Sequence, residues 1–474
     1  MSTQMLKTVQ GTSAPLDETT INSLRVRVRG PVLLPADPGY DAARAIWNGM
    51  INRRPGVIVR CTGTADVIEA VKFAREHGLL VSVRAGGHNI AGLSIAEGGV
   101  MIDLTPMKGV VVDPHGRRAV AQAGCTLGNL DRETQVHGLA TVLGFVSLTG
   151  AAGLTLGGGF GYLTRKHGWA SDNLLSAEMV AADGRVVRAS ERENPDLLWA
   201  LRGGGGNFGI VTSLEYQLHP VGPRIMGGII LHPIDQAEKL LRFFRELTSS
   251  APRELTAVFL CRPAPALPWV PSEWHGRPVA ALVVCHSGAL DQARRDLAPI
   301  KAWGHPIVDQ IVEKAYCDQQ MMLDATQPSG RHYYWKSEWI PGISDEMIPV
   351  FLERARSFPS PFSLILLFHV AGAIGERPAD ATAVGNRDAV FNLTFQAAWD
   401  AGPKEVPIGW ARESWRAVRR FSTGGVYVNF LTEEEGRDRV AEAYKENFDR
   451  LARVKGKWDP GNFFRTNQNI TPAL

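Results

Sequence analysis

A histidine lies within a turn of small residues in the segment VSVRAGGHNIAGLS, residues 81–94. His88 follows a glycine pair and precedes Asn89, at the end of a run whose apolar residues predict a strand over 79–85. A neutral imidazole in such a turn could bond covalently to a bound cofactor, or it could act as a general base. A lone histidine could equally be a satisfied core residue. The glycines around His88, and further glycine clusters nearby in the chain, favour the chemical role.

Two more glycine clusters follow, GFVSLTGAAGLTLGGGFG at 144–161 and RGGGGNFG at 202–209. Glycine turns let backbone N–H groups approach a pyrophosphate closely. Neither cluster ends in the Lys-Ser/Thr pair of a P-loop, and 144–161 lacks the setting of a Rossmann dinucleotide site. Either cluster alone could be a close-packed turn. Three glycine-rich turns in one part of the chain favour a cofactor-binding domain.

The elements that must position these turns follow from the apolar patterns. A strand over 55–61, a helix over 64–78 and the strand over 79–85 predict a β-α-β unit, with Thr64 as N-cap and Gly78 as C-cap. Further short strands are predicted over 99–104, 109–114, 118–124 and 210–218, with a helix over 193–200.

We expect three segments, at 1–220, 221–423 and 424–474. The middle segment alternates strands with amphipathic helices, which is typical of an α+β fold with an antiparallel sheet and helices on one face. Its strands are predicted over 224–233, 254–261, 279–288, 363–372 and 389–399, and its helices over 235–250, 290–304 and 344–358. The last segment predicts a strand over 424–431 and a helix over 434–458.

The composition excludes several classes of function. Of 474 residues, 45% are hydrophobic and 21% charged, and the net charge of +3 offers no electrostatic reason to bind nucleic acid or a membrane. Five separate cysteines and twelve scattered histidines, without metal-ligand spacing, predict neither a disulfide framework nor a metal site. No apolar run suits a signal peptide or a membrane span, so we expect a cytoplasmic protein, monomeric or homodimeric.

Four stretches, at 81–94, 144–190, 194–220 and 427–470, together resemble the berberine bridge enzyme-like group of vanillyl-alcohol oxidase-type flavoproteins. The resemblance implies a PCMH-type FAD-binding domain with two small α/β subdomains, built from the first and last segments. It also implies that the antiparallel sheet of the middle segment covers the flavin ring.

The resemblance implies that His88 is linked to the 8α-methyl group of FAD. Members with two links carry a cysteine where this chain has Val146, so a single link is expected, with Cys125 as a small buried residue. The expected cofactor-binding residues are Arg84, Ala85, Gly86, Gly87, His88, Asn89, Gly92, Leu93, Thr149, Gly150, Gly153, Leu154, Gly158, Gly159, Tyr162, Gly209, Ile210 and Asn429.

The catalytic base is less well marked. The group often has Tyr-x-Asn-Tyr beside the flavin, whereas this chain has Tyr427-Val428-Asn429-Phe430. Strand alternation places Tyr427 and Asn429 on one face and Phe430 on the other, so Tyr427 is either a catalytic or a structural residue. Candidate bases in the middle segment are Tyr334 and His369, with Tyr333, Lys336, Asn392 and Gln396 as further possibilities.

The activity implied is an FAD-dependent oxidation of a small molecule, an alcohol, a sugar hemiacetal or a secondary-metabolite ring. The substrate would give a hydride to flavin N5, and O2 would reoxidise the flavin to give H2O2. The alternatives are a dehydrogenase of the same fold that uses another acceptor, and a flavin-binding protein without turnover.

Overall fold

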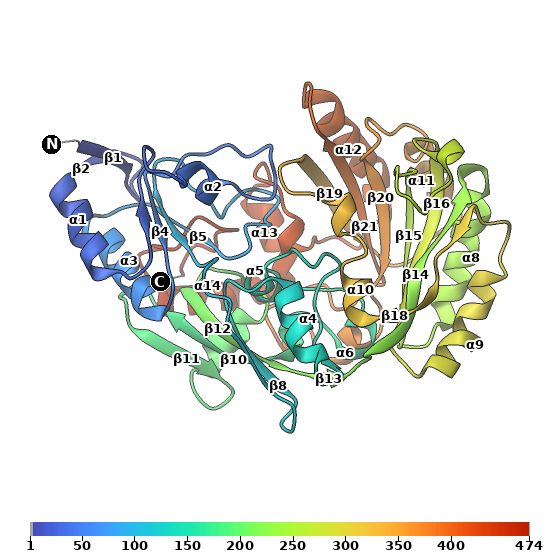
Figure 1. The fold of residues 1–474 in the computed structure, drawn as a ribbon, viewed down its shortest axis with the longest axis horizontal. Coiled ribbons are helices and arrows are strands. Elements are labelled where there is room, and N and C mark those ends of the chain that lie inside the picture. The colour runs from blue at the N-terminus through green and yellow to red at the C-terminus, as the bar shows by residue number, and fades with distance from the viewer. Residues whose placement is uncertain (1–2, 474) are drawn as a thin grey trace.

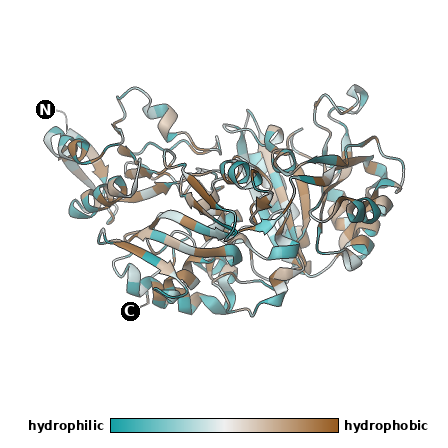
Figure 2. Ribbon diagram, turned by 60° about the horizontal axis from the view of Figure 1, so that its bottom comes forward, coloured by the Kyte–Doolittle hydropathy of each residue, from teal (hydrophilic) through white to brown (hydrophobic). Residues whose placement is uncertain are grey.

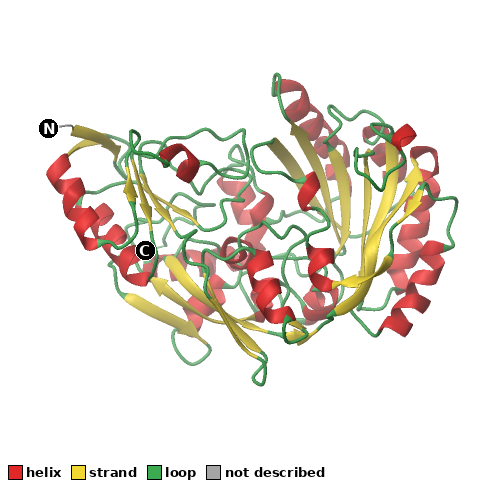
Figure 3. Cartoon of the chain, viewed as in Figure 1, coloured by secondary structure: helices red, strands yellow, loops and turns green. Residues whose placement is uncertain are grey.

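The computed structural model describes residues 3–473, so residues 1, 2 and 474, at the ends of the predicted first and last segments, lie outside the described residues. Two groups of sheets lie on opposite sides of the molecule (Figures 1 and 3). Strands from the first half of the chain form the smaller sheets, and strands from the middle form one large sheet. The mixed helices and sheets confirm the predicted α+β class, and the division of the chain at 220 and 423 stays a prediction.

The predicted β-α-β unit forms in a four-stranded sheet of order β3-β4-β6-β5. Its strands are β3 (Val32–Leu33), β4 (Val57–Arg60), β5 (Val81–Arg84) and β6 (Val100–Asp103), and α3 (Thr64–Glu76) connects β4 to β5. Strands β4 and β5 both run parallel to β6. Thr64 is not the N-cap, because the helix begins at that residue after Gly63, and the Thr64 hydroxyl donates to Glu178 instead. The C-cap is His77, one residue before the predicted Gly78.

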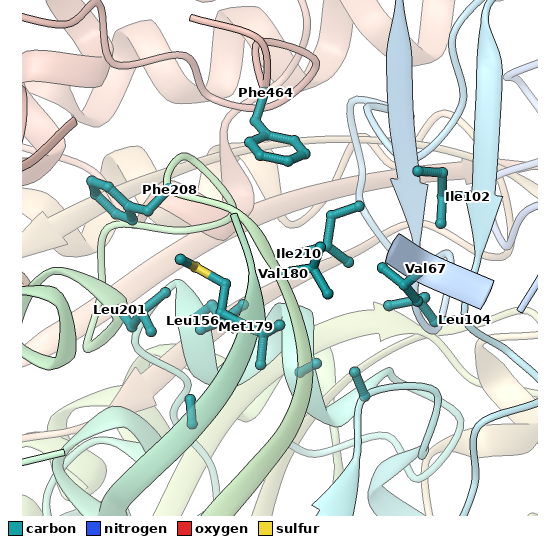
Figure 4. Close-up of a cluster of buried hydrophobic side chains, with 14 of the residues drawn as sticks. Val67, Ile102, Leu104, Leu156, Met179, Val180, Leu201, Phe208, Ile210 and Phe464 are labelled. Atoms are coloured by element: carbon teal, nitrogen blue, oxygen red, sulfur yellow. The ribbon is translucent and has the colours of Figure 1, made fainter. Parts of the chain in front are cut away.

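A five-stranded antiparallel sheet of order β11-β10-β12-β8-β7 lies against this unit. Its strands are β7 (Val110–Asp113), β8 (Arg118–Gln122), β10 (Leu174–Val180), β11 (Val186–Ser190) and β12 (Ile210–Gln217), and α4 (Leu127–Gln135), α5 (Ala151–Leu156) and α7 (Pro195–Leu201) belong to the same half. Side chains from both sheets share one hydrophobic core, in which Ile102, Met179 and Ile210 meet Phe464 from the chain's last residues (Figure 4). The two ends of the chain therefore fold as one unit.

The middle of the chain forms an eight-stranded sheet of order β17-β14-β16-β15-β20-β21-β19, in which β18 also pairs with β14. All of its pairings are antiparallel. Its strands are β14 (Arg224–Pro233), β15 (Leu255–Pro263), β16 (Pro278–His286), β17 (Val308–Asp309), β18 (Val312–Ala315), β19 (His332–Ile340), β20 (Leu364–His369) and β21 (Phe391–Trp399).

Helices α8 (Ala237–Ser250), α9 (Leu290–Lys301), α11 (Met347–Arg354) and α12 (Glu405–Val418) cover the outer face of this sheet. Its inner face is turned towards the first half of the chain (Figure 1). The sequence did not predict α12. In Figure 2 hydrophobic residues lie mainly along the strands, as expected for sheets buried between layers.

The tail differs from its prediction in two places. Residues Val428–Phe430 form a short 3-10 helix (η7) rather than a strand. The predicted helix over 434–458 is two helices, α13 (Arg437–Tyr444) and α14 (Phe448–Trp458), because Lys445 has a φ of 48° and interrupts the helical backbone. The remaining elements are β1 (Thr3–Lys7), β2 (Ser13–Asp17), α1 (Glu18–Arg27), α2 (Tyr40–Arg44), β9 (Leu139–Ala140), α6 (Thr164–His167), β13 (His219–Pro220) and α10 (Tyr316–Gln320).

Within residues 3–473, no helix has the length and apolar character needed to cross a membrane.

Candidate functional site

A cavity of about 390 Å³ lies between the glycine-rich turns of the first half and the inner face of the large sheet. Its wall includes the turn after β5 with its neighbouring glycine clusters, the inner-face side chains of the sheet, and two stretches of the tail. The volume suits the reactive part of a cofactor together with a small substrate.

His88 lies in the wall of this cavity, directly after β5. Its ring stacks on Trp47, with ring centroids 4.1 Å apart and planes 17° apart. Its Nε2 atom is buried and has no hydrogen-bond partner among the described residues. Burial lowers the pKa of His88 to about 4, because a charged imidazole would be desolvated there. The ring is therefore neutral at neutral pH, so one of its two nitrogens has a lone pair.

Glycine is required where the His88 turn meets the start of α5. A Cβ atom on Gly86 would lie 2.4 Å from the Cα atom of Gly150, and one on Gly150 would lie 2.5 Å from the Gly86 nitrogen. Gly153 and Gly206 also line the cavity, and a Cβ atom on either would enter open space. Since side chains at those positions would fill the cavity, the glycines keep room for a bound group.

The tail closes the cavity on the side of the third glycine cluster. Lys455 is buried in α14, and its Nζ atom donates to the carbonyl oxygens of Asn207 at 2.6 Å and Phe464 at 2.9 Å. The carboxylate of Asp459 lies 2.6 Å from the same nitrogen. The Asn207 side chain in turn accepts a hydrogen bond from the Ile470 N–H at 2.9 Å. These contacts attach the end of the chain to the loop at 202–209.

Most of the expected cofactor-binding residues line this one cavity. They are Ala85, Gly86, Gly87, His88, Asn89, Leu93, Thr149, Gly150, Gly153, Leu154, Gly209, Ile210 and Asn429. The other five, Arg84, Gly92, Gly158, Gly159 and Tyr162, do not line it. The Arg84 guanidinium donates to the Ala43 carbonyl on the other side of the turn, and the buried Tyr162 ring packs edge-on against Phe145. Gly159 contributes indirectly, because its N–H donates a hydrogen bond to the oxygen of Tyr427, which lines the cavity.

Tyr427, Asn429 and Phe430 all line the cavity, so the predicted division of these residues between two strand faces is wrong. The cause is the 3-10 turn at Val428–Phe430, which does not alternate as a strand does. The Tyr427 oxygen accepts hydrogen bonds from the Gly159 N–H at 3.0 Å and from the Asn429 amide at 2.8 Å. Burial nevertheless raises the pKa of Tyr427 to about 12.

Tyr334 and His369, the candidate bases of the middle segment, do not line the cavity. The Tyr334 hydroxyl is hydrogen-bonded to Glu434 and Arg412, towards the helical face of the sheet. His369 lies at the end of β20 against Phe391, and burial lowers its pKa to about 3. Alternation along β19 explains the position of Tyr334, because its neighbour Trp335 has the side chain on the cavity side.

Of the other four candidate bases, one lines the cavity and three do not. Gln396 lines the cavity, and its amide donates to the Gln327 side chain at 2.8 Å. Tyr333, Lys336 and Asn392 do not line it. The Lys336 Nζ atom is instead paired with Glu434 at 2.8 Å and with Glu435. Among the described residues that line the cavity there is no aspartate, glutamate or lysine.

Three residues that line the cavity are not among the site residues expected from the sequence, namely Trp47, Trp335 and Arg262. Trp47 stacks on both His88 and Tyr333, and no local motif marks it. Trp335 follows Tyr333 and Tyr334 in the chain, and the residue of these three that faces the cavity cannot be chosen without the strand register. Arg262 is a lone charge between apolar residues, which was the available signal.

The positions relevant to a second covalent link are clear. Val146 lines the cavity, and its side chain has no group that could bond to a cofactor. Cys125 is buried and is absent from the cavity wall. Its thiol has a pKa raised to about 11 by burial, so it is not a reactive thiolate at neutral pH.

Comparison with known proteins agrees with this geometry. A family model described as an FAD binding domain matches residues 55–190, and one described as berberine and berberine like matches residues 426–471. The (R)-6-hydroxynicotine oxidase of Paenarthrobacter nicotinovorans is 35% identical over 460 residues, which are 94% of this chain and 97% of that protein. The chain belongs to the berberine bridge enzyme-like FAD-linked oxidoreductases.

A solved structure and a further relative support the assignment. The crystal structure of 6-hydroxy-D-nicotine oxidase from Arthrobacter nicotinovorans superposes with a TM-score of 0.83 at 31% identity, covering 94% of this chain and 98% of that one. Xylooligosaccharide oxidase of Thermothelomyces thermophilus is 28% identical over 453 residues, 90% of this chain and 89% of that protein. This berberine bridge enzyme-like chain is thus an FAD-dependent oxidoreductase with the PCMH-type fold.

The residues present fit FAD. The unpaired Nε2 atom of His88, the close contact of Gly86 with Gly150 and the open space beside Gly153 and Gly206 all lie on the wall formed by the FAD-binding segments. These features leave space for a flat ring system and offer it one neutral nucleophile.

Proposed function

We propose that the protein is an oxidase whose FAD is joined to His88 alone, and that it oxidises a small alcohol, sugar hemiacetal or secondary metabolite. The observation that carries this proposal is the imidazole of His88, which lies in the wall of a glycine-lined cavity and is neutral at neutral pH because its pKa is lowered to about 4. Val146 and the distant, protonated thiol of Cys125 support a single link.

The flavin, when bound, would take a hydride from the substrate and transfer the electrons to O2, which yields H2O2. The protein's own residues would bind and orient the substrate and exclude water from it. The inner face of the sheet supplies aliphatic and aromatic side chains, including Leu260, Leu366 and Phe368, that keep the substrate in an apolar environment. Gln396 offers the substrate an amide on the same face.

Tyr427 is the residue that we propose takes the substrate's hydroxyl proton. Tyr427 lines the cavity, and its oxygen accepts hydrogen bonds from the Gly159 N–H and the Asn429 amide. Both donors would stabilise the phenolate that forms when the proton is removed. They thereby oppose the burial that otherwise raises the pKa of the phenol.

The covalent link is tested by denaturing the purified protein in acid and asking whether the yellow chromophore stays with the pellet. We expect colour to stay with the wild type and to wash out of a His88→Ala variant. Colour that washes out of both would overturn the covalent link but leave FAD binding intact. Protein without colour, even after FAD is added, would contradict the cofactor itself.

The acceptor is tested separately. Steady-state O2 consumption at the rate of substrate oxidation supports an oxidase, and slow O2 consumption with fast dye reduction identifies a dehydrogenase. Bound flavin that no substrate in a broad panel bleaches without air would favour a protein that binds flavin without turnover.

A further inference from the structure

Arg262 is a buried cation in the wall of the cavity. It lies at the end of β15, and only 8% of its surface is exposed. Its Nε atom donates to the carbonyl of Pro263 at 3.1 Å. Its two terminal nitrogens donate no hydrogen bond to any of residues 3–473, and no carboxylate in that range forms an ion pair with it.

The surroundings of Arg262 supply no negative charge. Burial, together with the nearby Arg331, lowers its pKa to about 10, so the guanidinium is still charged at neutral pH. The cavity wall contains no aspartate or glutamate among the described residues. A buried charge without a partner is unfavourable, and proteins normally pair such groups or bind a ligand with them. The two terminal nitrogens of Arg262 are therefore available to bind an anion that enters the cavity.

The strand register places Arg262 on the face that lies over the cavity. Arg262 pairs with Val279, and the next strand brings Leu364 beside it, since Cys261 pairs with Ile365. Leu364 pairs with Gln396, which in turn pairs with Trp335. The row Val279, Arg262, Leu364, Gln396 and Trp335 thus crosses the inner face, and all five line the cavity.

The row has two distinct ends. Trp335 stacks near Trp47, with ring centroids 5.7 Å apart, and Trp47 stacks on His88. Strands β19 and β15 are three strand spacings apart, about 14 Å. The neighbouring row on the same face contains Ala281, Leu260, Leu366 and Thr394, of which only Thr394 is polar. A ligand lying along the sheet would therefore have an apolar surface under its body and a cation at the end away from His88.

We propose that the substrate carries a carboxylate, or an anion of the same geometry, that pairs with the guanidinium of Arg262 while its apolar body lies on the inner face of the sheet. The proposal rests on the proposed oxidase function and specifies its substrate class. A planar guanidinium matches a carboxylate through two parallel N–H···O bonds, which makes arginine the fitting residue at this place.

The experiment measures binding rather than turnover, so it does not depend on the oxidation step. Phenylacetate and phenylacetamide, and 1-naphthoate and 1-naphthamide, are titrated into the holoprotein by calorimetry. The proteins are the wild type, Arg262→Met, Arg262→Lys and, as a matched control, Arg277→Met, which removes an exposed arginine next to the following strand. Melting temperatures show that each variant is folded.

We expect the wild type and Arg277→Met to bind each acid about tenfold or more tightly than its amide. Arg262→Met should lose this preference while it still binds the amides, and Arg262→Lys should keep part of it. Equal binding of acids and amides by the wild type, no binding of either acid, or a preference that survives in Arg262→Met would overturn the proposal. A retained acid preference in a protein that oxidises nothing would instead count against the oxidase function alone.

Discussion

The indole of Trp47 lies face to face with the imidazole of His88, with the ring centroids 4.1 Å apart. Trp47 also stacks on Tyr333 of the large sheet, with ring centroids 3.9 Å apart. The Nε1 atom of Trp47 donates a hydrogen bond to the Gln327 carbonyl at 3.0 Å. The imidazole of the FAD-binding half is thus held by a ring that is itself fixed by the sheet.

Trp47→Leu should slow formation of the His88 link, because the imidazole loses the ring that orients it. A stacked pair contributes roughly 0.5–1.5 kcal/mol, so a rate reduction of about twofold to tenfold is expected. The measurement is the fraction of protein with covalent flavin against time after FAD is added to apoprotein. Trp274→Leu, away from the cavity wall, is the control, and equal rates in all three proteins would contradict the orienting role.

The rate of flavin attachment should be nearly independent of pH between 6 and 8. The low pKa of His88, about 4, keeps the imidazole neutral and nucleophilic over that whole range. Attachment should fall only as the pH approaches 4 and the ring is protonated. Rates are measured on apoprotein mixed with FAD at each pH, and a rise centred near pH 6.5 would show an ordinary, solvated imidazole instead.

The turnover of the wild type should increase with pH over the neutral and mildly alkaline range. Tyr427, with a pKa of about 12, is mostly protonated in this range. Each unit of pH therefore increases its deprotonated, reactive fraction about tenfold, as long as bound flavin and substrate leave this pKa unchanged.

Tyr427→Phe keeps the ring that packs on Phe430 at 4.9 Å but removes the oxygen. We expect kcat to fall about 10²-fold or more, with loss of the pH slope and little change in substrate binding. A variant with unchanged kcat and an unchanged pH profile would leave Tyr427 a structural residue.

Stability should also depend on pH through Asp131, a buried residue of α4. Burial raises its pKa to about 7, although the Gln320 amide donates to it at 3.0 Å. The contribution of Asp131 to the free energy of unfolding is fully present below about pH 4, where its carboxyl is protonated in both the folded and the unfolded chain. It decreases as the pH rises towards 7, because the unfolded chain ionises first.

Asp131→Asn should therefore raise the melting temperature at pH 8 and leave it nearly unchanged at pH 4. Since one pKa unit corresponds to about 1.4 kcal/mol, the gain in unfolding free energy at pH 8 is of the order of a few kcal/mol. Thermal unfolding is followed at both pH values, with Asp235→Asn as the exposed control. Equal melting curves at pH 8 would mean that water or a local shift relieves the buried carboxylate.

The sequence was informative where local pattern decides structure. The strand before His88, the helix over 64–78 and the strands over 224–233 and 389–399 follow from apolar periodicity and turn residues, and each is found within a few positions. The FAD-binding fold followed from several short motifs considered together. Such motifs are readable in the sequence because they constrain the backbone. The close approach of Gly86 to Gly150, which leaves no room for a side chain, is an example.

The substrate side could not be derived in the same way. Which of Tyr334 and Trp335 lies over the cavity depends on the strand's phase, and a shift of one residue exchanges the two faces. Arg262 lies one residue beyond the predicted end of its strand, so its membership of the inner face was hidden. The tail turn at Val428–Phe430 has strand-like composition, and its tertiary contacts outweigh that preference.

The salt bridge and carbonyl contacts of Lys455 have a consequence for how the protein is made. A chain emerging from the ribosome presents His88 and the first glycine turns long before residues 455–470 exist. The loop at 202–209 receives its partners only with those last residues, so the cofactor compartment is completed at the end of synthesis. A nascent chain stalled before residue 455 therefore lacks the residues that complete this compartment.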